Sequence, residues 1–101
     1  MKTATTPKKL EEGEVADRML RLRGWTRDGN AIERTFEFRN FKEAMTFVGR
    51  VAEAAEGAQH HPDIDIRYSK VRLALSTHSA GGLTEKDFAL AERVDGLAVN
   101  R

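Results

Sequence analysis

One stretch decides the fold of this chain: Asp63-Ile64-Asp65-Ile66-Arg67-Tyr68-Ser69-Lys70-Val71-Arg72-Leu73-Ala74-Leu75. Apolar side chains alternate with charged or small ones on both sides of a polar pair. Because successive side chains of a strand point to opposite faces, the alternation predicts two strands that each bury one face. We expect Ser69-Lys70 to form the turn between them, which makes the stretch an antiparallel hairpin.

A second hairpin precedes this one. Residues 25–27 are expected to form a short strand, Asp28-Gly29-Asn30 is a strong turn signal, and residues 32–39 again alternate. Arg34 interrupts the apolar face of that second strand.

Three helices are expected around the two hairpins, because apolar residues recur there at intervals of three and four. Gly24 and Gly57 are the expected ends of the first two helices, and Asn40 is the expected N-cap of the second. The third helix begins at Thr84, which forms a capping-box pattern with Asp87. The expected spans are residues 15–22, 41–55 and 84–97.

The order αββαββα predicts the α+β class, with a four-stranded antiparallel sheet and three helices packed on one face. The opposite face of the sheet would carry Glu33, Arg67 and Arg72 and could meet water or a partner. Residues 1–9 are expected to be a flexible N-terminal tail, and residues 10–101 a single domain.

Composition narrows the functional classes. The chain has 101 residues, a net charge of +1 and no cysteine, which excludes disulfides and thiolate chemistry. Its charges are mixed in sign, so bulk electrostatics give no reason to expect nucleic-acid binding. No apolar run approaches the roughly 20 residues of a membrane span. We therefore expect a cytoplasmic protein without nucleic-acid or membrane partners, and its small core favours a homo-oligomer.

The three histidines of the chain, His60, His61 and His78, gather around the residue 63–75 hairpin. With a turn at Ser69-Lys70, Tyr68 would pair with Val71, and the same register would place His61 opposite His78. A slip of one residue would reverse the faces but keep the two histidines close. Histidine exchanges protons near neutral pH, so the cluster predicts proton transfer or metal binding.

Simpler interpretations stay open for each residue. His60 could be structural or merely exposed, Glu56 could be a solvated helix residue, and Asp87 could serve only as a helix cap. The three histidines could also hold zinc, but the spacing His60-His61-x16-His78 matches no standard zinc pattern. Proton transfer therefore ranks above a metal site.

At these residues the chain resembles a known family. The run Glu56-x3-His60-His61-Pro62-x5-Tyr68-x9-His78-x8-Asp87 is similar to the signature of the pterin-4a-carbinolamine dehydratases. Gly24-Trp25, Tyr68-Ser69-Lys70-Val71 and Ser76-Thr77-His78 also resemble that family. The resemblance runs from about Val15 to the C-terminus and implies the same αββαββα fold.

The resemblance implies the dehydration of a 4a-hydroxytetrahydropterin to quinonoid dihydropterin, which supports pterin recycling for aromatic amino acid hydroxylation. It implies His60 and His78 as the acid–base pair and His61 as a residue that also holds the pterin. Substrate binding would further involve Glu56, which would accept hydrogen bonds from the ring, the Ser76-Thr77 backbone, and Asp87, which would orient a histidine. The pterin is the substrate, so neither a metal nor another cofactor is implied.

The family also implies a homodimer or homotetramer and a functional link to a phenylalanine hydroxylase. Two departures from its pattern are visible: Gln59 stands where Asp or Asn is usual, and Ala80 stands where animal members have Cys. Two other classes of function remain, a non-catalytic binding or dimerisation partner of a hydroxylase or regulator, and a small zinc protein.

Overall fold

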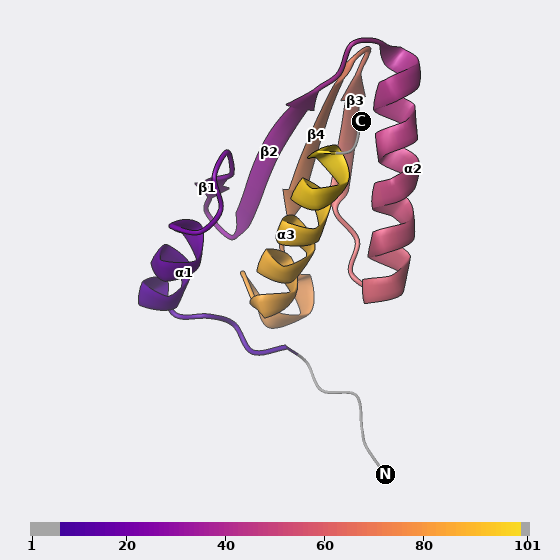
Figure 1. Cartoon of the computed structure of the whole chain (residues 1–101). Coiled ribbons are helices and arrows are strands. Elements are labelled where there is room, and N and C mark those ends of the chain that lie inside the picture. The colour runs from indigo at the N-terminus through magenta and orange to yellow at the C-terminus, as the bar shows by residue number, and fades with distance from the viewer. Residues whose placement is uncertain (1–6, 100–101) are drawn as a thin grey trace.

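The structure is a computed structural model, and it describes residues 7–99 (Figure 1). Its elements are, in chain order, α1 (Glu12–Met19), β1 (Thr26–Asp28), β2 (Ala31–Glu37), α2 (Phe41–Ala58), β3 (Asp63–Arg67), β4 (Lys70–Leu75), a 3₁₀ turn η1 (His78–Ala80) and α3 (Glu85–Val99). This is the predicted αββαββα order. Most of the predicted tail lies outside the described residues.

The four strands form one antiparallel sheet in the order β1-β2-β4-β3. Helices α2 and α3 lie side by side across one face, and α1 lies beside β1 (Figure 1). The face beneath the helices is apolar and forms most of the core, with Ile32 and Phe36 from β2 and Val71, Leu73 and Leu75 from β4. The α+β prediction is confirmed.

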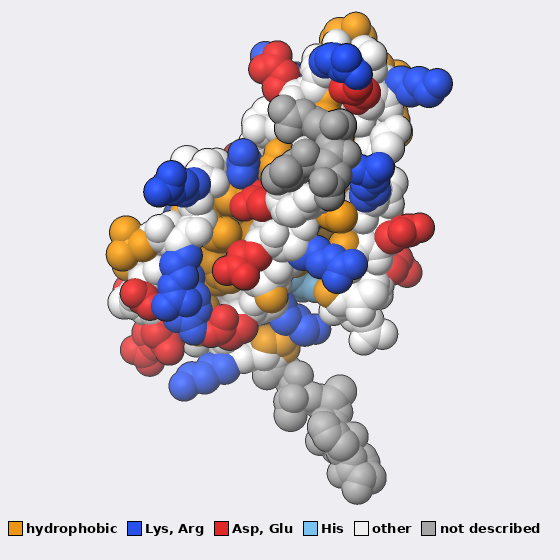
Figure 2. Space-filling view, viewed as in Figure 1, with side chains coloured by type: hydrophobic (Ala, Val, Ile, Leu, Met, Phe, Trp, Pro, Cys, Tyr) orange, Lys and Arg blue, Asp and Glu red, His pale blue; other side chains and the backbone are white. Residues whose placement is uncertain are grey.

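The other face of the sheet is charged, as its alternation predicted. Glu33 lies on β2 beside Arg72 on β4, and the Arg72 Nε donates to the Glu33 carboxylate at 2.6 Å. On β3, the Arg67 Nε donates to Asp65 at 3.3 Å. Charges of both signs are likewise mixed over the molecular surface seen in Figure 2. None of the helices within residues 7–99 has both the length and the apolar character that a membrane crossing needs.

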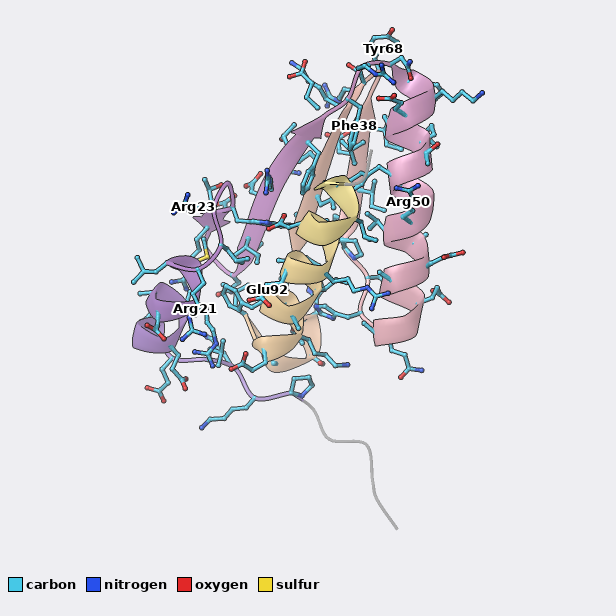
Figure 3. The ribbon with its side chains drawn as sticks, viewed as in Figure 1. Arg21, Arg23, Phe38, Arg50, Tyr68 and Glu92 are labelled. Carbon is cyan, nitrogen blue, oxygen red and sulfur yellow. The ribbon has the colours of Figure 1, made fainter. Side chains whose placement is uncertain are left out.

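The turn of the second hairpin was predicted one residue too late. Arg67 pairs with Lys70, so the loop is Tyr68-Ser69, and Tyr68 adopts a left-handed φ of 55°. A bulky residue seldom takes this conformation, which is why the pattern favoured a strand through Tyr68. The shifted turn pairs Ile66 with Val71 and lets the Ser69 carbonyl accept from the Phe38 amide at 2.9 Å, at the end of the sheet where Figure 3 labels Phe38 and Tyr68.

Two helix ends also differ from the predictions. α1 ends at Met19 rather than near Gly24, and Leu20 is 84% exposed. The chain then turns so that Leu22 and Trp25 enter the core. α2 passes through Gly57 and ends at Ala58, because Gln59 takes the left-handed position that the sequence pattern assigned to the glycine.

Arg34, which interrupts the apolar face of β2, has a structural explanation. Asp95 of α3 accepts from the Trp25 indole Nε1 at 2.9 Å and from the Arg34 guanidinium at 3.0 Å. The guanidinium carbon lies 4.5 Å from the centre of the Phe36 ring. This polar contact ties the segment before β1 and strand β2 to α3.

Replacing Asp95 with Ala leaves the Trp25 N–H and the Arg34 guanidinium without their acceptor. We expect the free energy of unfolding to fall by about 1.5–3 kcal/mol, the range for hydrogen bonds to a charged group. Urea denaturation followed by circular dichroism measures this. Asp17→Ala, on the exposed side of α1, is the control and should change stability by less than about 0.5 kcal/mol. Equal losses in the two variants would contradict the role given to Asp95.

Candidate functional site

His60 is directed into the protein by the way α2 ends. Gln59 is left-handed at φ 52° and ψ 44°, and the His60 amide donates back to the Ala55 carbonyl at 3.1 Å. This is a Schellman ending, in which the residue after the left-handed one packs against the last turn of the helix. His60 and Ala55 are accordingly both buried. Asn and Asp adopt the left-handed conformation more readily than Gln, so the Asp or Asn that the resemblance leads us to expect at position 59 would suit this helix end.

The buried carboxylate of Asp87 lies at the centre of the site. Its Oδ1 is 2.6 Å from the His60 Nε2, and its Oδ2 accepts from the Thr77 hydroxyl at 2.8 Å and from the Thr84 amide at 2.9 Å. Asp87 is fully buried, so these contacts replace the water that an ionised carboxylate would otherwise bind. One side chain thus connects the loop before β3, the segment after β4 and the start of α3.

The two threonines complete this network. Because the Thr77 hydroxyl donates its proton to Asp87, the Thr84 hydroxyl is the donor in the 2.9 Å contact between the two hydroxyls. The Thr84 oxygen in turn accepts from the Lys86 amide at 3.2 Å. Asp87 therefore makes its half of the predicted capping box by accepting from the Thr84 amide, while the Thr84 hydroxyl caps the Lys86 amide instead of the Asp87 amide. The cap and the His60 contact coexist on one carboxylate.

The register of the sheet explains why His60 and Thr77 meet. The last pair of the β3–β4 ladder is Asp63 with Ala74. Continued outward, that register puts His60 opposite Thr77 on the core face, and both side chains do contact Asp87. The same continuation puts His61 opposite Ser76 on the open face. The predicted pairing of His61 with His78 is therefore wrong by two residues, because the turn falls at Tyr68-Ser69.

The other two histidines are exposed and differ in their partners. The His61 Nε2 lies 2.7 Å from a Glu56 carboxylate oxygen. His78 opens the η1 turn and, among the described residues, its ring has no hydrogen-bond partner. His78 lines a cavity of about 240 Å³ together with Ser76, Thr77, Gly81, Gly82, Asp28, Asn30 and Ala31.

The His60 ring has one nitrogen left for chemistry. Its Nε2 faces Asp87, and no buried side-chain nitrogen or oxygen in residues 7–99 lacks a hydrogen-bond partner. The Nδ1 has no partner within the described chain, so it must reach the surface. With the proton on Nε2 facing the carboxylate, Nδ1 carries the lone pair and can accept a proton.

Two further observations bear on alternative sites. In the part of the chain that the structure describes, no three His, Asp or Glu side chains gather closely enough to hold a metal ion. A hollow of about 380 Å³ lies between α2 and α3 and is larger than the His78 cavity. Its lining includes Glu53, Lys86 and Arg93 but none of the predicted site residues. The predicted site residues Ser76, Thr77 and His78 thus line the smaller cavity, and Thr77 connects it to Asp87.

The structure brings together some predicted site residues more closely than others. His60, Thr77 and Asp87 are in direct contact, Glu56 contacts only His61 among the site residues, and Ser76 and His78 share the cavity. Sequence reasoning missed Asp28 and Asn30 as lining residues. The pairing of Ile32 with Leu75 brings their turn to the end of β4, and no local pattern reveals that pairing.

Comparison with known proteins identifies the family of this chain. The model of the family described as pterin 4 alpha carbinolamine dehydratase matches residues 8–97. A protein of Thermomicrobium roseum is 53% identical over 89% of this chain and 97% of its own length. One from Chloroflexus aurantiacus is 56% identical over 88% and 96%. Both carry the provisional name pterin-4-alpha-carbinolamine dehydratase.

Solved structures share the fold. A transcriptional coactivator/pterin dehydratase from Brucella melitensis superposes with a TM-score of 0.87 at 34% identity, over 90% of this chain and 99% of that one. A pterin dehydratase-like protein described as a RuBisCO assembly factor of the α-carboxysome gives 0.61 at 25% identity, over 73% and 86%.

The fold and the site define an α+β domain that places a buried histidine–aspartate pair at the open end of a hairpin. The chain belongs to the pterin 4 alpha carbinolamine dehydratase family.

Replacing Asp87 with Asn should change the tautomer of His60. The amide oxygen would keep the two donors at the Oδ2 position, Thr77 and Thr84, so the amide NH₂ would face the His60 Nε2. The ring would then carry its proton on Nδ1. Long-range ¹H–¹⁵N NMR spectra of the imidazole distinguish the two tautomers, and we expect stability to fall by about 1–3 kcal/mol. A folded Asp87→Asn protein whose His60 still carries its proton on Nε2 would contradict this geometry.

Proposed function

We propose that the protein dehydrates 4a-hydroxytetrahydropterins to quinonoid dihydropterins by histidine acid–base catalysis. The single observation that carries the proposal is the contact of Asp87 with both His60 and Thr77. Through these two contacts, Asp87 holds the His60 ring close to Thr77, the residue that directly precedes His78. Family membership supports the same reaction.

The reaction needs one acid and one base. The bond between C4a and the hydroxyl oxygen breaks, the oxygen takes a proton and leaves as water, and the neighbouring ring nitrogen supplies the electron pair and then loses its own proton. No electrons are gained or lost overall. Positioned proton transfer of this kind typically contributes about 10²–10⁴-fold to the rate.

The three imidazoles have different environments, which suits different tasks. His60, held through Nε2 by Asp87, would take the nitrogen proton on Nδ1. His78, exposed and without a partner in residues 7–99, can turn towards the leaving oxygen and protonate it. His61, oriented by Glu56, would hold the pterin ring from the open face of the sheet. Of the predicted ring-binding groups, the free Glu56 oxygen and the Ser76 backbone would bind the edges of the ring. The Thr77 amide donates to the Gly82 carbonyl and the Thr77 carbonyl accepts from the Ala80 amide, so the Thr77 backbone is already engaged.

The substrate of this reaction forms when an aromatic amino acid hydroxylase oxidises its tetrahydropterin. We therefore propose that the protein works with a hydroxylase of the phenylalanine type and returns its cofactor to the recycling pathway. Homodimer or homotetramer formation remains a prediction. The two sheet edges, β1 and β3, and the exposed Phe41 and Tyr68 side chains are surfaces through which copies could join.

A second candidate function is non-catalytic binding to another protein. Two structures with this fold support this candidate, because one is described as a transcriptional coactivator/pterin dehydratase and the other as a RuBisCO assembly factor. The intact His60–Asp87 pair and the unpartnered His78 favour the enzyme, because a binding role would not require them.

The two functions are separated by one assay. A hydroxylase generates the 4a-hydroxytetrahydropterin, whose decay is followed by absorbance with and without the protein. We expect His60→Gln and His78→Gln each to reduce the catalysed rate by about 10²-fold or more. Arg93→Gln, in the α2–α3 hollow, is the matched control and should keep the wild-type rate. A wild type no faster than the His60→Ala/His78→Ala double variant would exclude the dehydratase.

A further inference from the structure

The cavity beside His78 has a wall that the proposed reaction does not use. This wall is the β1–β2 turn, which contributes Asp28, Asn30 and Ala31 to the lining. Ile32 pairs with the buried Leu75, so the next pair outward brings Ala31 beside Ser76 on the open face. Asp28 pairs with Ala31 and shares that face. A row of four positions thus runs across the sheet end: His61, Ser76, Ala31 and Asp28.

The row matches the length of a substituted pterin. Neighbouring strands lie about 4.8 Å apart, so three steps span about 14 Å. A pterin ring covers roughly half of that distance, and its C2 amino group and its C6 substituent lie at opposite ends of the bicycle. With the amino end beside Glu56 and His61, the C6 substituent would point along the row towards the β1–β2 turn.

The β1–β2 turn is held in place from behind. The Arg27 Nε donates to the Gly29 carbonyl at 2.8 Å, and the other two guanidinium nitrogens donate to the Glu12 carboxylate at 2.7 and 2.9 Å. The Arg27 hydrogen bonds and charge lower the pKa of Glu12, and the hydrogen bond to Glu12 raises the pKa of Arg27. Helix α1 thus fixes a turn that is otherwise exposed.

Asp28 is available to a ligand. Its carboxylate makes no hydrogen bond or ion pair with the rest of residues 7–99, although it lines the cavity. Arg27, the adjacent cation, is engaged by Glu12. The Lys9 side chain passes against Gly82, and Lys9 lines a separate hollow with Glu11 and Glu12 rather than the His78 cavity. The turn therefore offers an acceptor carboxylate and the Asn30 amide to whatever enters the cavity.

We propose that Asp28 and Asn30 are specificity-determining residues that hydrogen-bond a hydroxylated C6 side chain of the pterin and disfavour an anionic one. The inference rests on the proposed function, because it assumes a pterin in the site. A carboxylate accepts strongly from hydroxyl groups and repels a negatively charged substituent. Arg27 is a positioning residue, which acts only by holding the turn.

Equilibrium binding of stable dihydropterins tests this directly, without any turnover. Isothermal titration calorimetry would compare 7,8-dihydropterins that carry a methyl, a dihydroxypropyl or a carboxylate group at C6. We expect the wild type to prefer the dihydroxypropyl compound over the methyl compound by about tenfold, the value of one charge-assisted hydrogen bond. In Asp28→Asn most of this preference should disappear, and binding of the carboxylate compound should improve about tenfold.

The control variant is Asp17→Asn, an exposed carboxylate of α1 outside the cavity, which should keep all three affinities. Arg27→Gln should reduce the dihydroxypropyl preference while Asp28 is still present, and Arg27→Lys should restore part of it. Equal weakening of the methyl and dihydroxypropyl compounds by Asp28→Asn would overturn the proposal, since Asp28 would then bind the ring itself. Unchanged affinities in that variant would overturn it as well.

The outcomes also separate this inference from the proposed function. A wild type that binds the pterins with the expected preference but does not accelerate dehydration would exclude the dehydratase and leave the specificity assignment standing. Dehydratase activity without any preference for the C6 substituent would support the dehydratase and overturn the specificity assignment of Asp28 and Asn30. A wild type that binds none of the three pterins would overturn both.

Discussion

The site depends on one constraint, the burial of the Asp87 carboxylate among three donors. An ionised carboxylate loses its hydration when it is buried, and only well-placed donors can compensate for that loss. The donors come from three separate segments, namely His60 before β3, Thr77 after β4 and the Thr84 amide before α3. Folding that satisfies Asp87 therefore also brings these segments together, and the stability of the domain and the geometry of the site are coupled.

This coupling explains how a helix cap can also hold the histidine proposed as the catalytic base. As a cap, Asp87 needs only its Oδ2, which accepts from Thr84 and Thr77. The second oxygen is left for His60 and fixes which ring nitrogen carries the proton. The Schellman ending at Gln59 supplies the other half of the geometry, because it turns His60 inward at the end of α2. Two ordinary helix-terminal motifs thus produce the histidine–aspartate pair.

Much of the fold could be predicted from the sequence, because alternation and helical spacing are local signals. The residue 63–75 stretch gave the correct faces of β3 and β4, although its turn was placed one residue late. The error came from Tyr68, whose left-handed backbone no propensity would favour, and it moved the expected partner of His61 from Ser76 to His78. Because the pairing of β3 with β4 shifted by two residues, each side chain stayed on the face of the sheet that was predicted for it. The end of α2 was also predicted wrongly. Gly57, which readily takes the left-handed conformation, stays helical, and Gln59 takes that conformation after the last helical residue.

The candidate site residues were predicted from the spacing of the histidines and from a family resemblance, but their contacts could not be predicted in the same way. Which oxygen of Asp87 meets which donor depends on how α3 packs against the sheet. The nearness of Asp28 to His78 depends on the pairing of β2 with β4. Both are long-range consequences of tertiary packing. Sequence spacing placed the three histidines around one hairpin. It could not show that His60 is buried, that His61 contacts Glu56, or that the His78 ring has no partner within residues 7–99.

The most direct measurement is a crystal structure of the protein with a bound 7,8-dihydropterin. The account predicts that the His60 Nε2 stays within hydrogen-bond distance of Asp87, as in the 2.6 Å contact seen here, with the pterin ring between the His60 Nδ1 and His78. A pterin seated in the hollow between α2 and α3, or a His60 ring turned away from Asp87 in the complex, would contradict it.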